Sequence, residues 1–327
     1  MILISSLRAQ ERQISNAGAF AAPFTMISID ARGLAMGGAA TSVQSGIAGA
    51  IWNPSALAEA QHSFFISQAQ WIADIRINQA GVNFTLGNMG NIGAYMTVLD
   101  YGEMKVRTVQ KPEGTGENFD AADFSLALYY ARNLTDRLKF GIALKYISQR
   151  IWHSSAATAA FDIGTHFHTP LFGVDFAASI SNFGGDMRLF GRDNRVRHDI
   201  DPVMTGNNDK IPAYLELESW PLPILLRIGL SRRFHISAQH SFIFAADADY
   251  PQDNYPSLNL GAEYAFRKMF FLRIGYRGAF LVDNLGGLSG GLGYDWRLAN
   301  MNWSVNVAAV YWGILKNITV LSFTLSW

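Results

Sequence analysis

Hydrophobic and polar residues alternate along most of the chain, from about residue 62 to the C-terminus. The clearest example is the C-terminal segment, where one face carries Thr319, Leu321, Phe323, Leu325 and Trp327 and the other carries Val320, Ser322, Thr324 and Ser326. A period of two predicts β-strands with one apolar face. A terminal aromatic residue on such a strand is typical of the last strand of an outer-membrane β-barrel. A soluble β-sandwich also ends in amphipathic strands, so the rest of the chain must separate the two folds.

The strand-like segments are about ten residues long, which is the length of a tilted strand that crosses a bilayer. Candidate strands start near residues 62, 76, 91, 103, 119, 137, 157, 172, 223, 237, 257, 270, 288, 302 and 318. A single-chain bacterial barrel has an even number of strands. We therefore assign residues 103–109 to a long outer loop together with residues 110–118. The prediction is an all-β, transmembrane antiparallel β-barrel of about 14 strands.

The lengths of the connections predict which end of the barrel each one occupies. Short connections are predicted as periplasmic turns at residues 133–137, 169–172, 267–269 and 299–302. Longer ones are predicted to face outward at residues 150–156, 182–222 and 247–257. This asymmetry is usual for outer-membrane barrels.

The composition favours the membrane fold over a soluble one. Charged residues make up 16 % of the 327 residues, below the usual quarter or so, while aromatic residues reach 13 %. Lys plus Arg and Asp plus Glu are equal at 26 each, so there is no basic surface for nucleic acid. Cysteine is absent, which excludes disulfides and thiolate nucleophiles. The predicted location is the outer membrane of a two-membrane bacterium, with outer-membrane lipid as a contact.

The N-terminal part divides into two predicted segments. Residues 1–9 are similar to the end of a signal peptide, with Ala9 before the expected cleavage point. Residues 10–60 contain a stretch rich in glycine and alanine that has no strand pattern. Small residues allow close packing, and Asn53-Pro54 is a turn-forming pair. We expect residues 10–60 to form a plug inside a barrel of residues 61–327.

Two motifs in this segment resemble a known family. Arg32-Gly33-Leu-Ala-Met36-Gly37-Gly38-Ala and Trp52-Asn53-Pro54-Ser-Ala-Leu-Ala resemble the N-terminal signature of the PorV/PorQ family of outer-membrane proteins, which is similar to the FadL-like barrels. The stretch Asn207-Asn208-Asp209-Lys-Ile-Pro-Ala-Tyr and the run Trp220-Pro221-Leu-Pro also resemble that family. The resemblance covers nearly the whole chain. It implies a 14-stranded barrel with an N-terminal hatch and a structural role for the motifs.

Other patterns carry weaker chemical signals. Gly287-Leu-Ser289-Gly-Gly291 matches the nucleophile motif G-x-S-x-G, but a strand and not a helix follows it, so we predict no catalytic residue and no enzyme activity. His166 and His168 share a strand face, without a third ligand, so we predict no metal site and no cofactor. Inward-facing charges are predicted to pair with each other; they are Lys139, Lys145, Arg227, Arg233, Arg273, Arg277, Asp175, Asp247, Asp249, Glu263 and Asp295.

The resemblance to PorV/PorQ supplies the first functional hypothesis. The protein is then a non-enzymatic shuttle of protein secretion, of the type IX kind, with secreted cargo C-terminal domains or secretion-machinery subunits as partners. The partner-binding residues are expected in the loop 182–222, namely Asn207, Asn208, Asp209, Trp220 and Pro221.

The second hypothesis is a FadL-like transporter of hydrophobic small molecules. It predicts an apolar pocket near the plug, lined by Phe24, Met26, Met36 and Ile51. An open porin is disfavoured by the predicted plug.

Overall fold

The computed structural model describes residues 16–170, 172–199, 203, 210–281, 284, 287–313 and 317–327. The predicted signal-peptide remnant, residues 1–9, lies outside this part of the chain, as do residues 10–15 of the predicted plug and Asn207, Asn208 and Asp209 of the predicted partner loop.

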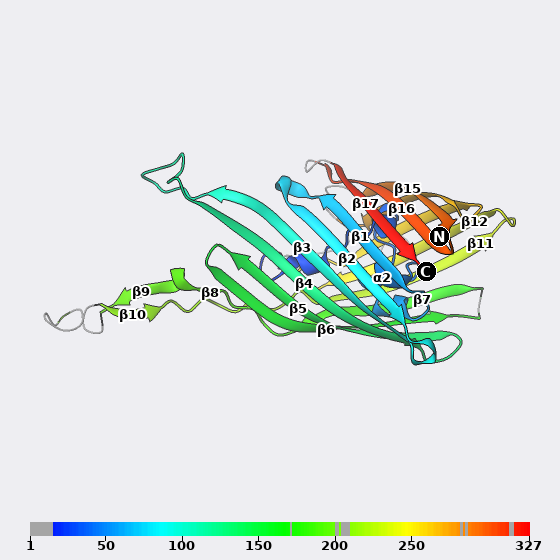
Figure 1. Cartoon of the computed structure of the whole chain (residues 1–327), viewed down its shortest axis with the longest axis horizontal. Helices are drawn as coiled ribbons and strands as arrows, with labels where there is room; N and C mark the ends of the chain where they lie inside the picture. The colour runs from blue at the N-terminus through cyan, green and yellow to red at the C-terminus, as the bar shows by residue number, and fades with distance from the viewer. Residues whose placement is uncertain are drawn as a thin grey trace, which may run out of the picture.

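Fourteen antiparallel strands of the described chain form a closed barrel (Figure 1). They are β1 (Ser63–Gln70), β2 (Arg76–Thr85), β3 (Asn91–Lys105), β4 (Asn118–Asn133), β5 (Leu138–Ile151), β6 (Ser154–His168), β7 (Val174–Gly184), β11 (Leu225–His235), β12 (His240–Pro251), β13 (Ser257–Phe266), β14 (Phe270–Ala279), β15 (Leu288–Leu298), β16 (Met301–Tyr311) and β17 (Asn317–Ser326). The barrel closes where β1 pairs with β17, with Ser63 opposite Ser326. The predicted fold is confirmed.

The C-terminal strand shows how the alternation of residues builds the wall. On β17, Leu321 is half exposed on the outer face, whereas Val320 and Ser322 are buried on the inner face. The Trp327 N–H continues the pairing by donating to the carbonyl of His62, 3.0 Å away. The outer face of the barrel is apolar along most strands, as a surface in contact with lipid requires.

The surplus strand candidate near residue 103 is a continuation of β3. A register shift between Asp100 and Glu103 interrupts the pairing of β3 with β4, which then resumes with Glu103 opposite Asp120. The expected outer loop therefore begins after Lys105 and is shorter than predicted.

The connection after β7 contains regular structure that its sequence did not predict. It holds β8 (Phe190–Gly191), η5 (Arg192–Asn194), β9 (Arg195–His198) and β10 (Ile211–Tyr214). The β9–β10 hairpin extends beyond the end of the barrel that lies opposite the C-terminus (Figure 1). An isolated bridge between Met187 and Trp220 joins the two arms of the connection.

The N-terminal segment, residues 16–60, forms short helices and turns. They are η1 (Pro23–Met26), α1 (Ala31–Ala35), α2 (Gly46–Ala50) and η2 (Pro54–Leu57). Outside this segment, two further single turns connect strands of the barrel: η3 (Ile72–Asp74) and η4 (Gly87–Met89). Helix α1 contacts β14 to β17, and η2 contacts β3 to β6. Among the described residues, no helix is long and apolar enough to span a membrane.

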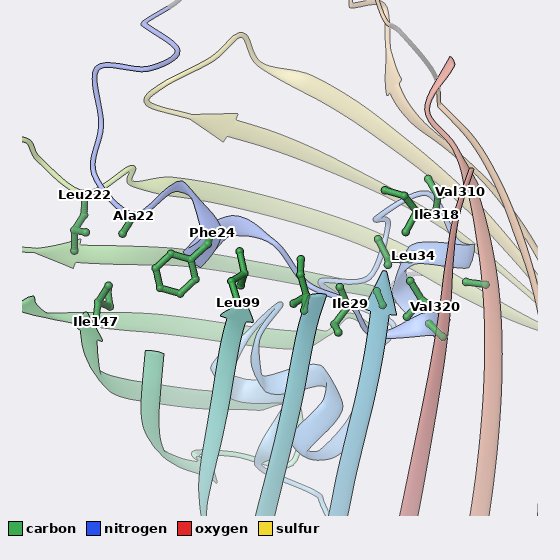
Figure 2. Close-up of a cluster of buried hydrophobic side chains, with 14 of the residues drawn as sticks. Ala22, Phe24, Ile29, Leu34, Leu99, Ile147, Leu222, Val310, Ile318 and Val320 are labelled. Carbon is green, nitrogen blue, oxygen red and sulfur yellow. The ribbon is translucent and has the colours of Figure 1, made fainter. Parts of the chain in front are cut away.

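The main apolar cluster joins the N-terminal segment to strands from both sides of the barrel (Figure 2). Its labelled members are Ala22, Phe24, Ile29 and Leu34 with Leu99, Ile147, Leu222, Val310, Ile318 and Val320. Residues 16–60 thus bury apolar side chains that only the inward-facing wall can cover.

Candidate functional site

Helix α1 begins at a buried carboxylate. The Asp30 side chain accepts hydrogen bonds from the backbone N–H groups of Gly33, at 2.7 Å, and Arg32, at 3.4 Å, and so caps the helix. Gln44 donates a further hydrogen bond to the same carboxylate. Burial raises the pKa of the Asp30 carboxyl, while the Gly33 N–H and the charge of Arg32 act in the opposite direction.

Glu263 on β13 ties the segment to the wall through two guanidinium groups. Arg32 donates to both oxygens of Glu263, each at 2.8 Å, and Arg273 of β14 donates to one of them at 2.6 Å. Arg273 also donates to the Asn306 side chain, 2.7 Å away. A carboxylate this deeply buried is stable only when it is paired and hydrogen-bonded, and Glu263 satisfies both conditions.

Inward-facing glycines of the wall receive the N-terminal segment. A Cβ atom at Gly275 would lie 2.0 Å from the backbone nitrogen of Gly37, and one at Gly164 would lie 2.0 Å from the Asn53 side-chain oxygen. At further wall glycines of the described chain, a Cβ atom would lie between 2.4 and 3.0 Å from the segment: Gly81, Gly93, Gly141, Gly229, Gly261 and Gly291. Glycine within a strand often marks the close approach of another backbone. The wall is therefore shaped to the segment along most of its length.

The second motif forms a compact turn on the opposite side of the lumen. Asn53 caps η2 and also donates from its amide to the carbonyl of Thr165 on β6, at 2.9 Å. Pro54 occupies the first turn of η2, where its missing N–H is no loss. The Trp52 ring packs beside Gly33 and lies 5.2 Å from the Arg227 guanidinium.

The glycines of the first motif contribute turns as well as contact. Gly37 and Gly38 have φ values of 69° and 87°. Residues other than glycine adopt such backbone angles only at a cost in free energy. After this turn, the N–H groups of Ala40 and Thr41 both donate to Asp247 of β12, each at 2.8 Å. All eight motif residues predicted from the sequence thus contact the wall or each other: Arg32, Gly33, Met36, Gly37, Gly38, Trp52, Asn53 and Pro54.

A small cavity of about 20 Å³ lies between η1 and the inner wall. Its lining combines apolar side chains, hydroxyl-bearing ones and one ammonium group: Phe24, Thr25, Ile51, Tyr95, Thr97, Ser125, Ala127, Tyr129 and Lys145. The Lys145 ammonium is neutralised by Asp162 at 2.6 Å. An engineered cavity of about 150 Å³ binds benzene, so the space seen here is too small to hold an aromatic ring.

The four pocket residues predicted from the sequence are divided between two places. Phe24 and Ile51 line the cavity. Met36 instead packs with Ala39, Ile243 and Ala245 in a separate cluster. Met26 belongs to η1 but does not line the cavity.

Phe24 covers the cavity from a single helical turn. Figure 2 shows its ring beside Leu99, while Ala22 lies next to Leu222. The turn is held by the Gln149 side chain, which accepts from the Ala22 N–H at 2.9 Å. Ala22 has φ 49° and ψ 49°, a left-handed conformation that costs roughly 1–2 kcal/mol in a residue with a Cβ.

The described residues of the predicted partner loop, Trp220 and Pro221, are both exposed. Pro221 accepts a hydrogen bond from the Ala21 N–H, at 2.9 Å, and so contacts the N-terminal segment. Trp220 is 46 % exposed and forms the bridge to Met187.

The residues with weaker chemical signals have structural contacts. Ser289 lies within β15 and donates to the carbonyl of Ala35, at 3.1 Å. His168 and His166 both face Asp175, at 2.8 and 3.8 Å. Within the described chain, no group of three or more His, Asp or Glu side chains could hold a metal ion.

Most of the residues that hold or line the cavity were not predicted from the sequence. Gln79 of β2 accepts from the Ile29 N–H and from the Tyr95 hydroxyl, and donates to the Ile27 carbonyl. Tyr129 of β4 lines the cavity. The alternation of residues along each strand could have indicated them, because each of these polar residues occupies an inward position of a strand with an apolar outer face.

The comparisons identify the fold. No protein-family model matches the chain, and no curated protein matches it in sequence. The toluene transporter TbuX of Ralstonia pickettii aligns over 92 % of this chain and 98 % of its own, with 13 % identity and a TM-score of 0.56. The toluene transporter TodX of Pseudomonas putida covers 90 % of this chain and 95 % of its own, at 12 % identity and a TM-score of 0.53. A FadL homologue of Pseudomonas aeruginosa covers 94 % and 99 %, at 10 % identity and a TM-score of 0.53.

At these identities the similarity defines the fold and not the activity. The chain has the fold of the FadL-like outer-membrane β-barrels. Of the similar structures, TbuX and TodX are toluene transporters.

Proposed function

We propose that this protein is an outer-membrane transporter of hydrophobic small molecules, closed by residues 16–60 acting as a plug. The observation that carries the proposal is the cavity beneath Phe24, which is bounded by the N-terminal segment on one side and by β3 to β5 on the other. The similarity in fold to toluene transporters supports it. Monoaromatic hydrocarbons are the substrates we expect to fit, and no enzyme activity is part of the proposal.

Transport in this scheme begins with displacement of η1. The cavity of about 20 Å³ must grow severalfold to hold an aromatic ring. The strained backbone at Ala22 and the single turn that carries Phe24 are the parts of the segment best suited to move. Residues 30–58 are held by Glu263, Asp247 and the wall glycines, so we expect them to stay in place.

The proposal is tested by binding of toluene to the purified protein. Because a ligand that binds only the folded state stabilises it, toluene should raise the melting temperature in detergent. Ala127→Leu places a larger side chain in the cavity and should abolish this shift. Ala122→Leu, on the outer face of the same strand, is the matched control and should keep it. A wild-type protein whose melting temperature is unaffected by toluene would contradict the proposal.

A second candidate is the secretion role that the resemblance to PorV/PorQ implies. The observation in its favour is the β9–β10 hairpin, which extends beyond the barrel (Figure 1). Tyr214, at the end of β10, and the adjacent Leu215 are exposed apolar residues. The similarity to hydrocarbon transporters favours transport over this role. Deletion of residues 186–210 separates the two: a secretion shuttle would lose delivery of its cargo to the cell surface, whereas a transporter would keep toluene binding.

A further inference from the structure

One arginine stands on the apolar outer face of the barrel without an acidic partner. Arg232 is an exposed, outward-facing residue of β11, between the outward-facing Leu230 and Phe234. Its guanidinium lies 4.6 Å from the centre of the Phe234 ring, and no salt bridge involves it within the described chain. A lipid-facing arginine is costly in proportion to its depth, so this position requires an explanation.

The other outward-facing arginines of the described strands are accounted for. Arg76 pairs with Asp100, and Arg150 pairs with Asp120, in both cases at the end of the barrel opposite the C-terminus. Arg132 is the last residue but one of its strand, where water is in reach.

The side chain of Arg232 points toward the C-terminal end of the barrel. Phe234, over which the guanidinium lies, is two residues closer than Arg232 to the end of β11. That end carries the short turns and is the periplasmic end in the proposed orientation. Long basic side chains reach the lipid headgroups in this way.

A groove of about 670 Å³ lies next to Arg232 on the outer face of β11 to β15. Small outward-facing residues, Ala246 and Ala262, are flanked by larger ones, so the surface is hollowed between them. The flanking side chains are Leu230, Phe244, Ile274 and Tyr276. The groove is therefore apolar along its length and cationic at its periplasmic end.

We propose that this groove binds one anionic phospholipid of the periplasmic leaflet. Its phosphate contacts the Arg232 guanidinium, and one acyl chain lies over Ala246 and Ala262. The inference rests on the membrane insertion in the proposed function, but not on transport. A second copy of the barrel is a poorer occupant, because the outward-facing carboxylates of the described strands, Asp100, Glu103 and Asp120, lie at the other end of the barrel.

Native mass spectrometry of the detergent-solubilised protein tests the site. The probes are dioleoyl-phosphatidylglycerol, which is anionic, and dioleoyl-phosphatidylcholine, which is zwitterionic. The wild type should retain one phosphatidylglycerol in preference to phosphatidylcholine. Arg232→Gln should weaken phosphatidylglycerol binding about fivefold, as expected for one basic residue at a lipid surface. Arg132→Gln removes an outward-facing arginine far from the groove and should change nothing.

Filling the groove provides a second variant. Ala262→Trp should prevent lipid binding and leave toluene binding unchanged. If the tryptophan variant does not fold, Ala262→Leu is used in its place. Equal retention of phosphatidylglycerol by the wild type and Arg232→Gln would overturn the inference, as would a dimer that Ala262→Trp dissociates. A wild type that binds toluene but retains no lipid refutes only this inference. A wild type that retains lipid but never binds toluene refutes only the proposed transport.

Discussion

The backbone N–H of Ala21 donates a hydrogen bond to the carbonyl oxygen of Pro221, 2.9 Å away. Pro221 belongs to the long connection after β7, and Ala21 precedes the turn that carries Phe24. The next residue, Leu222, is 2 % exposed and belongs to the same apolar cluster as Phe24. The long outer connection and the cover of the cavity are therefore parts of one structure, and movement of one should be transmitted to the other.

Loosening this contact should free the N-terminal turn. Leu222→Ala removes buried apolar contacts at a cost of roughly 2–5 kcal/mol, part of which acts locally on η1. Hydrogen exchange of peptides that cover residues 20–27 should become faster. Leu217→Ala is the control, because Leu217 lies on the same connection but is 42 % exposed. Unchanged exchange in Leu222→Ala would show that the two parts are independent.

The wall glycines should be intolerant of a methyl group where the segment touches them. Gly275→Ala would place its Cβ 2.0 Å from the Gly37 nitrogen, so the segment must shift, at a cost of roughly 1–3 kcal/mol or more. Limited trypsin digestion should then cleave at Arg32, which the wild type protects. Gly290→Ala is the matched control on the neighbouring strand, because its nearest contact would be an ordinary 3.5 Å. Equal resistance of the two variants to trypsin would show that Gly275 is not needed to accommodate the N-terminal segment.

Loss of the Glu263 charge should destabilise the protein strongly. Glu263→Gln leaves the buried Arg32 and Arg273 without a carboxylate, and breaking a buried ion pair costs about 3–5 kcal/mol. The midpoint of chemical unfolding should fall accordingly. Asp120→Asn removes an exposed pair with Arg150, which water screens, and should leave the midpoint almost unchanged. If both variants unfold at the same midpoint, Glu263 is not the anchor of the segment.

Removing the cover of the cavity should have opposite effects on stability and binding. Phe24→Ala should lower the free energy of unfolding by roughly 3–5 kcal/mol, because Phe24 is buried. It should also bind toluene more tightly than the wild type, because the space no longer has to be opened. Phe84→Ala, on the outer face of β2 and 45 % exposed, should leave binding unchanged. Weaker toluene binding in Phe24→Ala would mean that the ligand does not occupy this cavity.

The barrel could be predicted from the sequence because its signal is local. Alternation with a period of two is visible within each strand, and the even-number rule removed the candidate at residue 103, which the structure shows to be part of β3. The regular hairpin of β9 and β10 was missed because four-residue strands are too short to show a period.

The contacts between the N-terminal segment and the barrel wall could be predicted only in part. Gly37 and Asn53-Pro54 stand out in the sequence, but their partners Gly275 and Gly164 lie more than a hundred residues away, and no local pattern connects them. The cavity depends on the same long-range contacts. Lys145 was predicted to face inward, but nothing in the sequence indicated that it lines the same cavity as Phe24.

The most direct test of the central claim is uptake of radiolabelled toluene by cells that lack other hydrocarbon channels. Cells that express the wild type should take up toluene faster than cells with an empty vector, and Ala127→Leu should return uptake to the empty-vector rate while Ala122→Leu does not. Folded barrel in the outer membrane is verified in each case by its resistance to trypsin. Wild-type cells that take up toluene no faster than empty-vector cells, with the folded barrel present, would contradict the account.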